Sequence, residues 1–176
     1  MSGTGSVRAE ADVHPDDWFL TCHFVDDMVM PGTLMYECCL HTLRIYLLRM
    51  GWIGEAGRIA YEPVPGVKSR LKCRGQVLAS TKKVWYEVTL KEVGEAGGSW
   101  SMVNGSWKES GASADDLSLY CIADALMYAD GKPIVEISNL SLRMSGLTEE
   151  RLKQVWVESP TYLYDQAKIM AYSNGK

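Results

Sequence analysis

The chain of 176 residues carries 18 basic and 22 acidic side chains, with a formal net charge of −4 and a pI near 5.4. Its length suits one domain with a sizeable core. The charges are interspersed and form no basic stripe of the kind that neutralises phosphates, which argues against nucleic acid as a partner.

The cysteines and the apolar segments indicate where the protein works. Five cysteines make an odd count without a Cys-x-x-Cys pair, so neither a disulfide framework nor a zinc site is expected. The N-terminus shows no apolar signal segment, and the longest apolar stretch, 34–50, is interrupted by Glu37, His41, Arg44 and Arg49. We therefore expect reduced thiols, a cytoplasmic location, no bound metal and no segment that spans a membrane.

The first predicted elements are a strand, a turn and a long helix. Apolar and charged side chains alternate over residues 7–13 and predict a short strand that ends at His14. Asp16 begins a turn or short helix. A helix follows over about 32–50, with apolar residues on almost every side, and Gly51 ends it. Such a helix is expected to be wrapped by other elements.

The remainder of the chain is dominated by predicted strands. Stretches rich in Val, Ile, Leu, Tyr and Trp occur at 58–62, 67–78, 83–93, 117–129 and 133–145. Asp130-Gly131, between the last two, is a strong hairpin signal. Residues 94–116 are richer in Gly, Ser and Ala and indicate a loop insertion with room for a short strand. One helix with a mostly antiparallel sheet is an α+β layout.

The C-terminal part has a different pattern from the strands. Thr148 is positioned to cap a helix that runs to about residue 157, and Pro160 separates a last segment over 161–172. We therefore expect a folded domain over 1–147 and a helical tail or linker over 148–176.

His23, Gly32 and Glu37 place an imidazole, a helix start and a carboxyl group in one short span. Pro31 suits the first position of a helix, and glycine allows another group to approach the backbone closely. The first amides of a helix have no intrahelical partner, and the dipole favours negative charge there, so an enolate oxygen would be stabilised. The span therefore offers a base, an acid and an oxyanion donor.

The order of these motifs resembles the hot-dog-fold 3-hydroxyacyl-ACP dehydratases of the β-hydroxydecanoyl-thioester dehydratase type. The resemblance runs through roughly residues 12–147 and rests on HPDDWFLTCHF from His14, MPGTL from Met30, GQVLASTKKVWY from Gly75 and ADALMYADGKPI from Ala123. Within this family, the sequence is most similar to dehydratase domains of polyunsaturated-fatty-acid synthases and related iterative polyketide synthases.

The resemblance implies a hot-dog fold, in which an antiparallel sheet wraps around the central helix at about 32–50. It implies that His23 removes the α-proton of a 3-hydroxyacyl thioester, that Gly32 binds the thioester oxygen, and that Glu37, protonated in an apolar tunnel, protonates the departing hydroxyl. The histidine of one protomer meets the carboxyl group of the other in such dimers, so a homodimer or a pseudo-dimer with a neighbouring hot-dog domain is expected. The substrate arrives on the phosphopantetheine of an acyl carrier protein, and no metal or other cofactor is implied.

Three departures from the family pattern bear on this mechanism. Glu37 stands where the isomerising bacterial members usually have aspartate, so elimination is expected and enoyl isomerisation stays open. Met28 and Thr33 replace a common proline and a common cysteine without removing a catalytic group. His41, one turn after Glu37, replaces an amide; it would weaken the acid when protonated and orient it when neutral.

Two other functions stay open at this point. One is a hot-dog acyl thioesterase, which uses a carboxylate on the same helix to activate water. The other is a non-catalytic hot-dog domain that acts as a scaffold in a multidomain synthase. The presence of both His23 and Glu37 favours dehydration over either alternative. Acyl chain length, unsaturation and the dimer partner do not follow from the sequence.

Overall fold

A computed structural model describes residues 5–54, 59–97, 100–103, 106–109 and 116–148. The elements in chain order are β1 (Ser6–Asp12), α1 (Trp18–Cys22), α2 (Gly32–Arg49), β2 (Ala60–Glu62), β3 (Arg70–Cys73), β4 (Lys83–Gly97), β5 (Trp100–Val103), β6 (Ser106–Glu109), β7 (Asp116–Ala129) and β8 (Lys132–Thr148).

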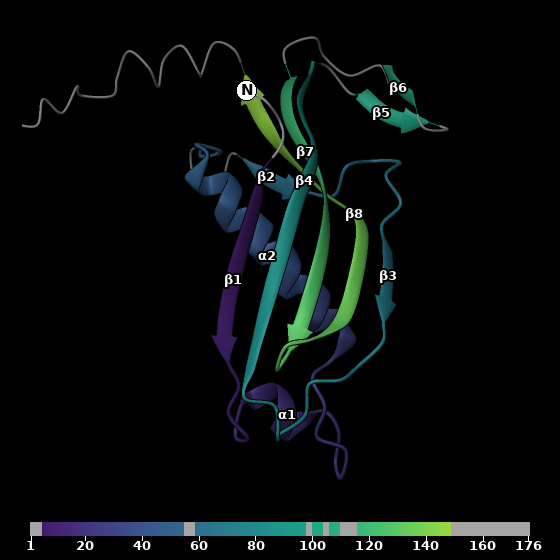
Figure 1. The fold of residues 1–176 in the computed structure, drawn as a ribbon. Helices are drawn as coiled ribbons and strands as arrows, with labels where there is room; N and C mark the ends of the chain where they lie inside the picture. Colours follow the sequence, from purple (N-terminus) through teal and green to yellow (C-terminus); the bar gives the residue numbers. More distant parts are fainter. Residues whose placement is uncertain (1–4, 55–58, 98–99, 104–105, 110–115, 149–176) are drawn as a thin grey trace, which may run out of the picture.

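The main sheet is antiparallel and curls around α2, which lies across its inner face (Figure 1). The strand order is β1-β4-β7-β8-β2, and β3 also pairs with β8. Because Glu62 of β2 stands opposite Arg143 and Cys73 of β3 stands opposite Val135, the two short strands follow one another along the same side of β8. This arrangement is the predicted hot-dog fold, of the α+β class.

The core fills the space between α2 and the inner face of the sheet. Its fully buried members include Leu20, Cys39, Leu43, Leu47, Val88, Ala123, Met127, Ile137, Leu140 and Leu142. Burying one such leucine or isoleucine side chain contributes about 1.5–3 kcal/mol. The packing of α2 on the sheet is therefore a main source of stability and fixes where the start of this helix lies.

One face of α2 is left uncovered within the described residues. Thr33, Glu37, His41, Ile45 and Leu48 follow one another at helical spacing and are all exposed. Ile45 is 48% exposed and Leu48 is 44% exposed. The prediction that other elements wrap the helix is confirmed for the side that faces the sheet, whereas the sheet of one domain leaves this other face open.

The predicted hairpin at Asp130-Gly131 is confirmed. Ala129 pairs with Lys132, so these two residues alone form the turn between β7 and β8. Their φ angles of 45° and 86° lie in the left-handed region, which a two-residue turn of this kind requires. The local residue choice thus determines the register with which β7 and β8 meet at the turn.

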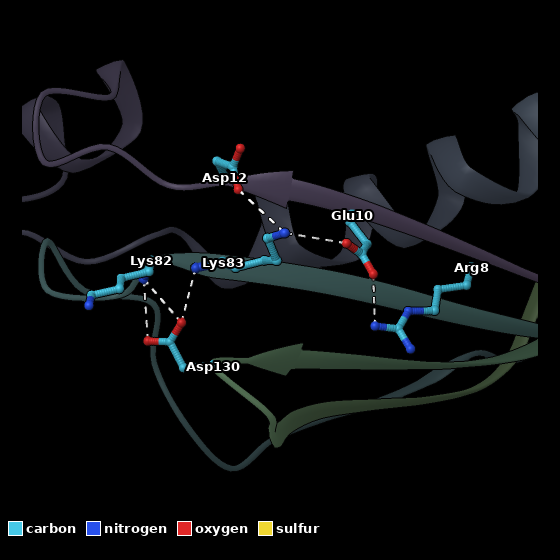
Figure 2. Close-up of polar contacts among 6 residues, drawn as sticks. All are labelled: Arg8, Glu10, Asp12, Lys82, Lys83 and Asp130. Atoms are coloured by element: carbon cyan, nitrogen blue, oxygen red, sulfur yellow. Dashed lines mark hydrogen bonds and ion pairs between the residues drawn. The ribbon is translucent and has the colours of Figure 1, made fainter.

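Asp130 also ties this hairpin to β4, as Figure 2 shows. Its Oδ1 accepts hydrogen bonds from the amides of Lys82 at 3.1 Å and Lys83 at 3.0 Å. The Lys83 ammonium lies 3.5 Å from Glu10 and 3.8 Å from Asp12 on β1. One end of the sheet is therefore held by a continuous polar cluster that joins β1, β4 and the hairpin.

Other predicted strands are correct in position but differ in extent. The run 67–78 is divided: β3 pairs with β8, whereas Leu78 forms an isolated bridge with Val29 and the Val77 carbonyl accepts from Met30 at 3.0 Å. β4 extends to Gly97, and the predicted loop insertion holds the paired strands β5 and β6.

The predicted C-terminal helix lies outside the described residues. Thr148, its predicted cap, is the last residue of β8, and the segment 149–176 is not described. All five cysteines are free, as predicted. Among the described residues, no helix combines the length and the apolar character needed to cross a membrane.

Candidate active site

His23 directly follows α1, and its ring orientation is fixed by the loop that leads to α2. Its Nδ1 lies 2.8 Å from the carbonyl oxygen of Val29, and the Val29 amide donates to the His23 carbonyl at 2.9 Å. A carbonyl oxygen can only accept, so Nδ1 carries the proton and Nε2 is the basic nitrogen of the neutral ring. The half-buried ring also packs on Phe24, with centroids 3.6 Å apart. The imidazole is thus prepared to take up a proton at Nε2.

Gly32 is the first residue of α2, and Pro31 is the N-cap. The predicted start of the helix is correct, but the proline precedes the first helical position instead of occupying it. Met35 donates to the Pro31 carbonyl at 3.1 Å, and within the described part of the chain no hydrogen bond reaches the Gly32 amide. This amide can donate to an incoming oxygen.

The packing of the chain itself does not demand a glycine at position 32. A Cβ built there would meet only the Cys73 sulfur, at 3.7 Å, which is ordinary van der Waals contact. Cys73 lies on β3, so the start of α2 adjoins this edge strand. The small residue instead leaves the helix start accessible to a group from outside the chain.

Glu37 lies on the uncovered face of α2. Its side chain is 52% exposed, and its Oε1 lies 3.2 Å from Nη1 of Arg44. The Arg44 side chain is 33% exposed, and its buried Nε has no hydrogen-bond partner. The apolar tunnel that the resemblance implies around Glu37 is therefore not formed by the described residues of one chain.

The spacing of Glu37, His41 and Arg44 already placed all three on one face of the helix. The structure brings Glu37 and Arg44 together, whereas His41 is exposed and no hydrogen bond or ion pair of the described residues includes it. The ion pair between Arg44 and Glu37 was not predicted, although the position of Arg44 seven residues after Glu37 was the available signal.

His23 and Glu37 are not joined by any hydrogen bond or ion pair in the described structure. Glu37 is five residues beyond Gly32, which corresponds to about 7.5 Å along the helix axis and about 140° around it. The carboxyl group therefore points away from the side on which Gly32 approaches Cys73. One chain therefore presents the His23 imidazole and the Gly32 amide on one side, and the Glu37 carboxyl group on another face.

The edge next to His23 is unpartnered and partly apolar. All four residues of β3 are exposed, and the neighbouring loop carries Phe24 at 56% and Val25 at 90% exposure. Leu71 and Leu78 are each about two fifths exposed. An open strand that exposes an apolar side chain such as Leu71 is typical of a surface that another domain covers.

The thiols near α2 have a packing role. Cys39 is fully buried, and burial raises its pKa to about 12. Burial also raises the pKa of the Cys38 thiol. Such thiols are poor nucleophiles at neutral pH. Cys39 therefore packs within the core, and the partly buried Cys38 packs against it.

A hollow on the outer face of the sheet lies apart from these groups. Its lining comes from β4, β7 and β8 and includes Glu87, Asp124 and Glu136. Neither His23 nor Glu37 contributes to it. Among the described residues, no group of three or more His, Cys, Asp and Glu side chains is arranged to hold a metal ion.

Known proteins share features of this chain. It aligns over 92 residues at 34% identity with one of the subunits of the polyunsaturated fatty acid synthase of Thraustochytrium sp.. The aligned part covers 52% of this chain but only 6% of that protein.

Similar folds occur in solved structures, at low identity. The fluoroacetyl-CoA thioesterase FlK gives a TM-score of 0.44 at 10% identity, covering 91% of this chain and 98% of that one. A hot-dog-like protein from Thermanaerovibrio acidaminovorans gives 0.41 at 14% identity, covering 90% and 93%.

The family model described as the FabA-like domain matches residues 1–117, which include His23, Gly32 and Glu37. That span is more than half of the chain and contains the helix α2 and the edge strand β3. The chain therefore belongs to the FabA-like domain family.

Proposed function

We propose that this domain eliminates water from 3-hydroxyacyl thioesters carried on the phosphopantetheine of an acyl carrier protein, giving trans-2-enoyl thioesters in fatty acid or polyketide synthesis. The observation that carries the proposal is the His23 ring, whose Nδ1 is held by the Val29 carbonyl at 2.8 Å. This contact leaves Nε2 basic, nine residues before the unpaired amide of Gly32. Membership of the FabA-like family and the similarity to part of a polyunsaturated fatty acid synthase support the same reaction class.

The proposed elimination uses three groups. His23 Nε2 takes the proton from the α-carbon, and the electrons pass to the thioester oxygen, which the Gly32 amide stabilises. The electrons then return to form the double bond as the β-hydroxyl leaves with a proton from Glu37. The products are one enoyl thioester and one water, and transfer of a proton from His23 to the Glu37 carboxylate restores both groups.

Glu37 would come from a second hot-dog domain. Within one chain the carboxyl group lies on the outer face of α2, away from the side of Gly32 that approaches Cys73. A second domain, either a copy or a neighbour, would supply its own carboxyl group to His23 and close an apolar tunnel around it. Arg44 is an unsuitable neighbour for an acid that must carry a proton, so we propose that docking separates Arg44 from Glu37.

The contact between Glu37 and Arg44 also supports a second candidate function. A carboxylate held by a guanidinium is suited to activate water, and the domain would then be an acyl thioesterase. In this alternative His23 has no necessary part. The two functions therefore differ in their product and in their dependence on His23.

One incubation separates the candidates. The full chain is mixed with 3-hydroxyacyl and with saturated acyl thioesters of graded length, on carrier protein and on pantetheine, with and without EDTA. A loss of one water from the 3-hydroxyacyl substrates alone, unaffected by EDTA, is expected for the dehydratase that needs no metal. Free acids from both substrate classes would identify a thioesterase, and the position of the double bond reports any isomerisation.

The five free thiols also fit work in a reducing compartment such as the cytoplasm. Unchanged substrates at a chain concentration at which sedimentation shows paired domains, with a correctly folded protein and an active dehydratase as positive control, would contradict both enzymatic candidates and leave the role of a scaffold domain.

A further inference from the structure

The edge strand β3 lies in a segment with a cation at every second residue: Lys68, Arg70, Lys72 and Arg74, here named the basic edge. All four are exposed. Arg70 stands opposite Ser138 on β8, and Lys72 stands opposite Glu136. The alternate residues Leu71 and Cys73 stand opposite the buried Ile137 and Val135. Arg70 and Lys72 therefore project from the outer face of the sheet, and Arg74 lies with them because it contacts Glu136.

Most of this positive charge is not neutralised within the described chain. Lys72 Nζ and Arg74 Nη2 share a single carboxylate, Glu136, at 3.2 Å each. No ion pair of the described residues includes Lys68 or Arg70. No basic stripe was expected, because acidic and basic residues are interspersed along the sequence. The cation at every second residue from 68 to 74 was the signal for this one.

The free side of β3 is open to another strand. β3 is hydrogen-bonded to β8 on one side, and in the described part of the chain no strand pairs with its other side (Figure 1). If this edge strand carried only charged side chains, they would be its usual protection against pairing with another chain. Here the edge strand itself also exposes an apolar side chain, since Leu71 is 40% exposed, and the exposed Leu78 follows it in the chain. The exposed apolar residues favour a covering partner over a merely protected edge.

A second copy of the chain is poorly suited to this edge. If the β3 strands of two copies paired to form one continuous sheet, they would be antiparallel and related by a twofold axis perpendicular to that sheet. Outer-face residues of one copy would then stand opposite outer-face residues of the other. Because the cations occupy every second position, each possible register brings cations opposite cations, for example Arg70 opposite Lys72, or Lys72 opposite itself. Like charges placed directly opposite destabilise strand pairing.

We propose that the basic edge selects a partner strand with carboxylates at alternate positions, carried by a hot-dog domain that is not a copy of this one. The identity of the partner as a hot-dog domain rests on the proposed function, whereas the charge selection rests on the register and exposure of β3. The Thraustochytrium relative is long enough to contain other domains, since this chain matches only 6% of it. A non-identical neighbour is therefore available in such a protein.

A charge-swapped copy tests the proposal with the full chain. In this copy Lys68, Arg70, Lys72 and Arg74 are changed to Glu, and Glu136 is changed to Lys to keep its two contacts with reversed sign. Sedimentation equilibrium at low salt is expected to show weak self-association of the wild type and of the swapped copy. An equimolar mixture is expected to form a 1:1 complex at least about tenfold tighter, and this preference should fade at high salt.

Two further variants keep the test decisive. Arg49→Glu/Lys132→Glu reverses two exposed cations outside the basic edge and is expected to give no preferential complex with the wild type. Lys68→Glu/Arg70→Glu leaves the contacts with Glu136 intact and is expected to self-associate more tightly than the wild type, because the introduced carboxylates then oppose Lys72 or Arg74 in most registers. This variant serves if the swapped copy does not fold, as judged by circular dichroism.

The result that would overturn the proposal is a wild type that forms tight dimers independent of salt, or a mixture of wild type and swapped copy without a preferential complex. Dehydratase assays on the same samples separate this outcome from the proposed function. An active wild-type homodimer would contradict only the proposed charge selection. A tight mixed complex that eliminates no water would contradict the proposed dehydratase activity and still support the charge selection.

Discussion

Replacing His23 separates the proposed chemistry from the fold. The side chain of His23→Ala loses one hydrogen bond, to the Val29 carbonyl, whereas the backbone bond from Val29 to position 23 stays. Losing a hydrogen bond of this kind costs about 1 kcal/mol of stability. Losing a general base costs about 10²- to 10⁴-fold in rate, which is about 3–5.5 kcal/mol of activation free energy. The effect on turnover should therefore exceed the effect on stability several times over.

The assay is single-turnover elimination from a 3-hydroxyacyl thioester, followed by mass, with urea unfolding of each variant in parallel. His23→Asn retains a donor toward the Val29 carbonyl but has no basic nitrogen, so its activity is expected to be as low as that of His23→Ala. His14→Ala is the matched control, since His14 lies exposed just after β1. Turnover of His23→Ala within about threefold of wild type would refute the assignment of the base.

Three further outcomes are expected. Glu37→Gln should lose most elimination activity and keep the fold. His41→Gln should leave turnover unchanged, because the His41 side chain is exposed and has no partner among the described residues. The pH profile of turnover checks both variants, and an equal loss for both would show that His41 orients the acid. Leu43→Ala, at a fully buried core position, should cost about 2–5 kcal/mol in urea unfolding. Ile45→Ala, on the uncovered face of α2, should cost under about 1 kcal/mol, and equal costs would contradict the described packing. Burial raises the pKa of Cys39 from 9.0 to about 12, so the unfolded chain releases this proton first and the free energy of unfolding should fall as pH rises from 9.0 to about 12. Cys39→Ala should reduce that slope without abolishing it, because burial also raises the pKa of Cys121 to about 12, and an unchanged slope would place its origin elsewhere.

The contact between Glu37 and Arg44 shows what a single domain leaves incomplete. The carboxyl group is more than half exposed and is engaged by a guanidinium, while the buried Nε of Arg44 has no partner. Leaving a buried donor unpaired costs about 1–3 kcal/mol. If docking moves Arg44 away from Glu37, as proposed, this nitrogen could reach an acceptor and regain that free energy while the second domain covers the exposed face of α2. The same docking step would thus improve packing and complete the site.

Much of the local structure could be read from the sequence because it depends on neighbouring residues. Asp130-Gly131 adopts the left-handed angles that a two-residue hairpin needs, and the start of α2 at Gly32 follows Pro31. The alternation over residues 7–13 corresponds to β1. The pairing of an imidazole with a helix start was also visible, because both groups lie in one short segment.

Only the tertiary structure decided which surfaces these elements share. The sequence could not show that one side of α2 stays uncovered, because its apolar residues occur all round the helix and the sheet reaches only some of them. Nor could the sequence show that one part of the run 67–78 pairs with β8 and another part with Val29. It also could not show that Arg70 and Lys72 lie on the outer face. These outcomes depend on the pairing of strands that are far apart in the chain. Such pairing is selected by the packing of the whole core, whereas turns and helix starts are selected by the residues that form them.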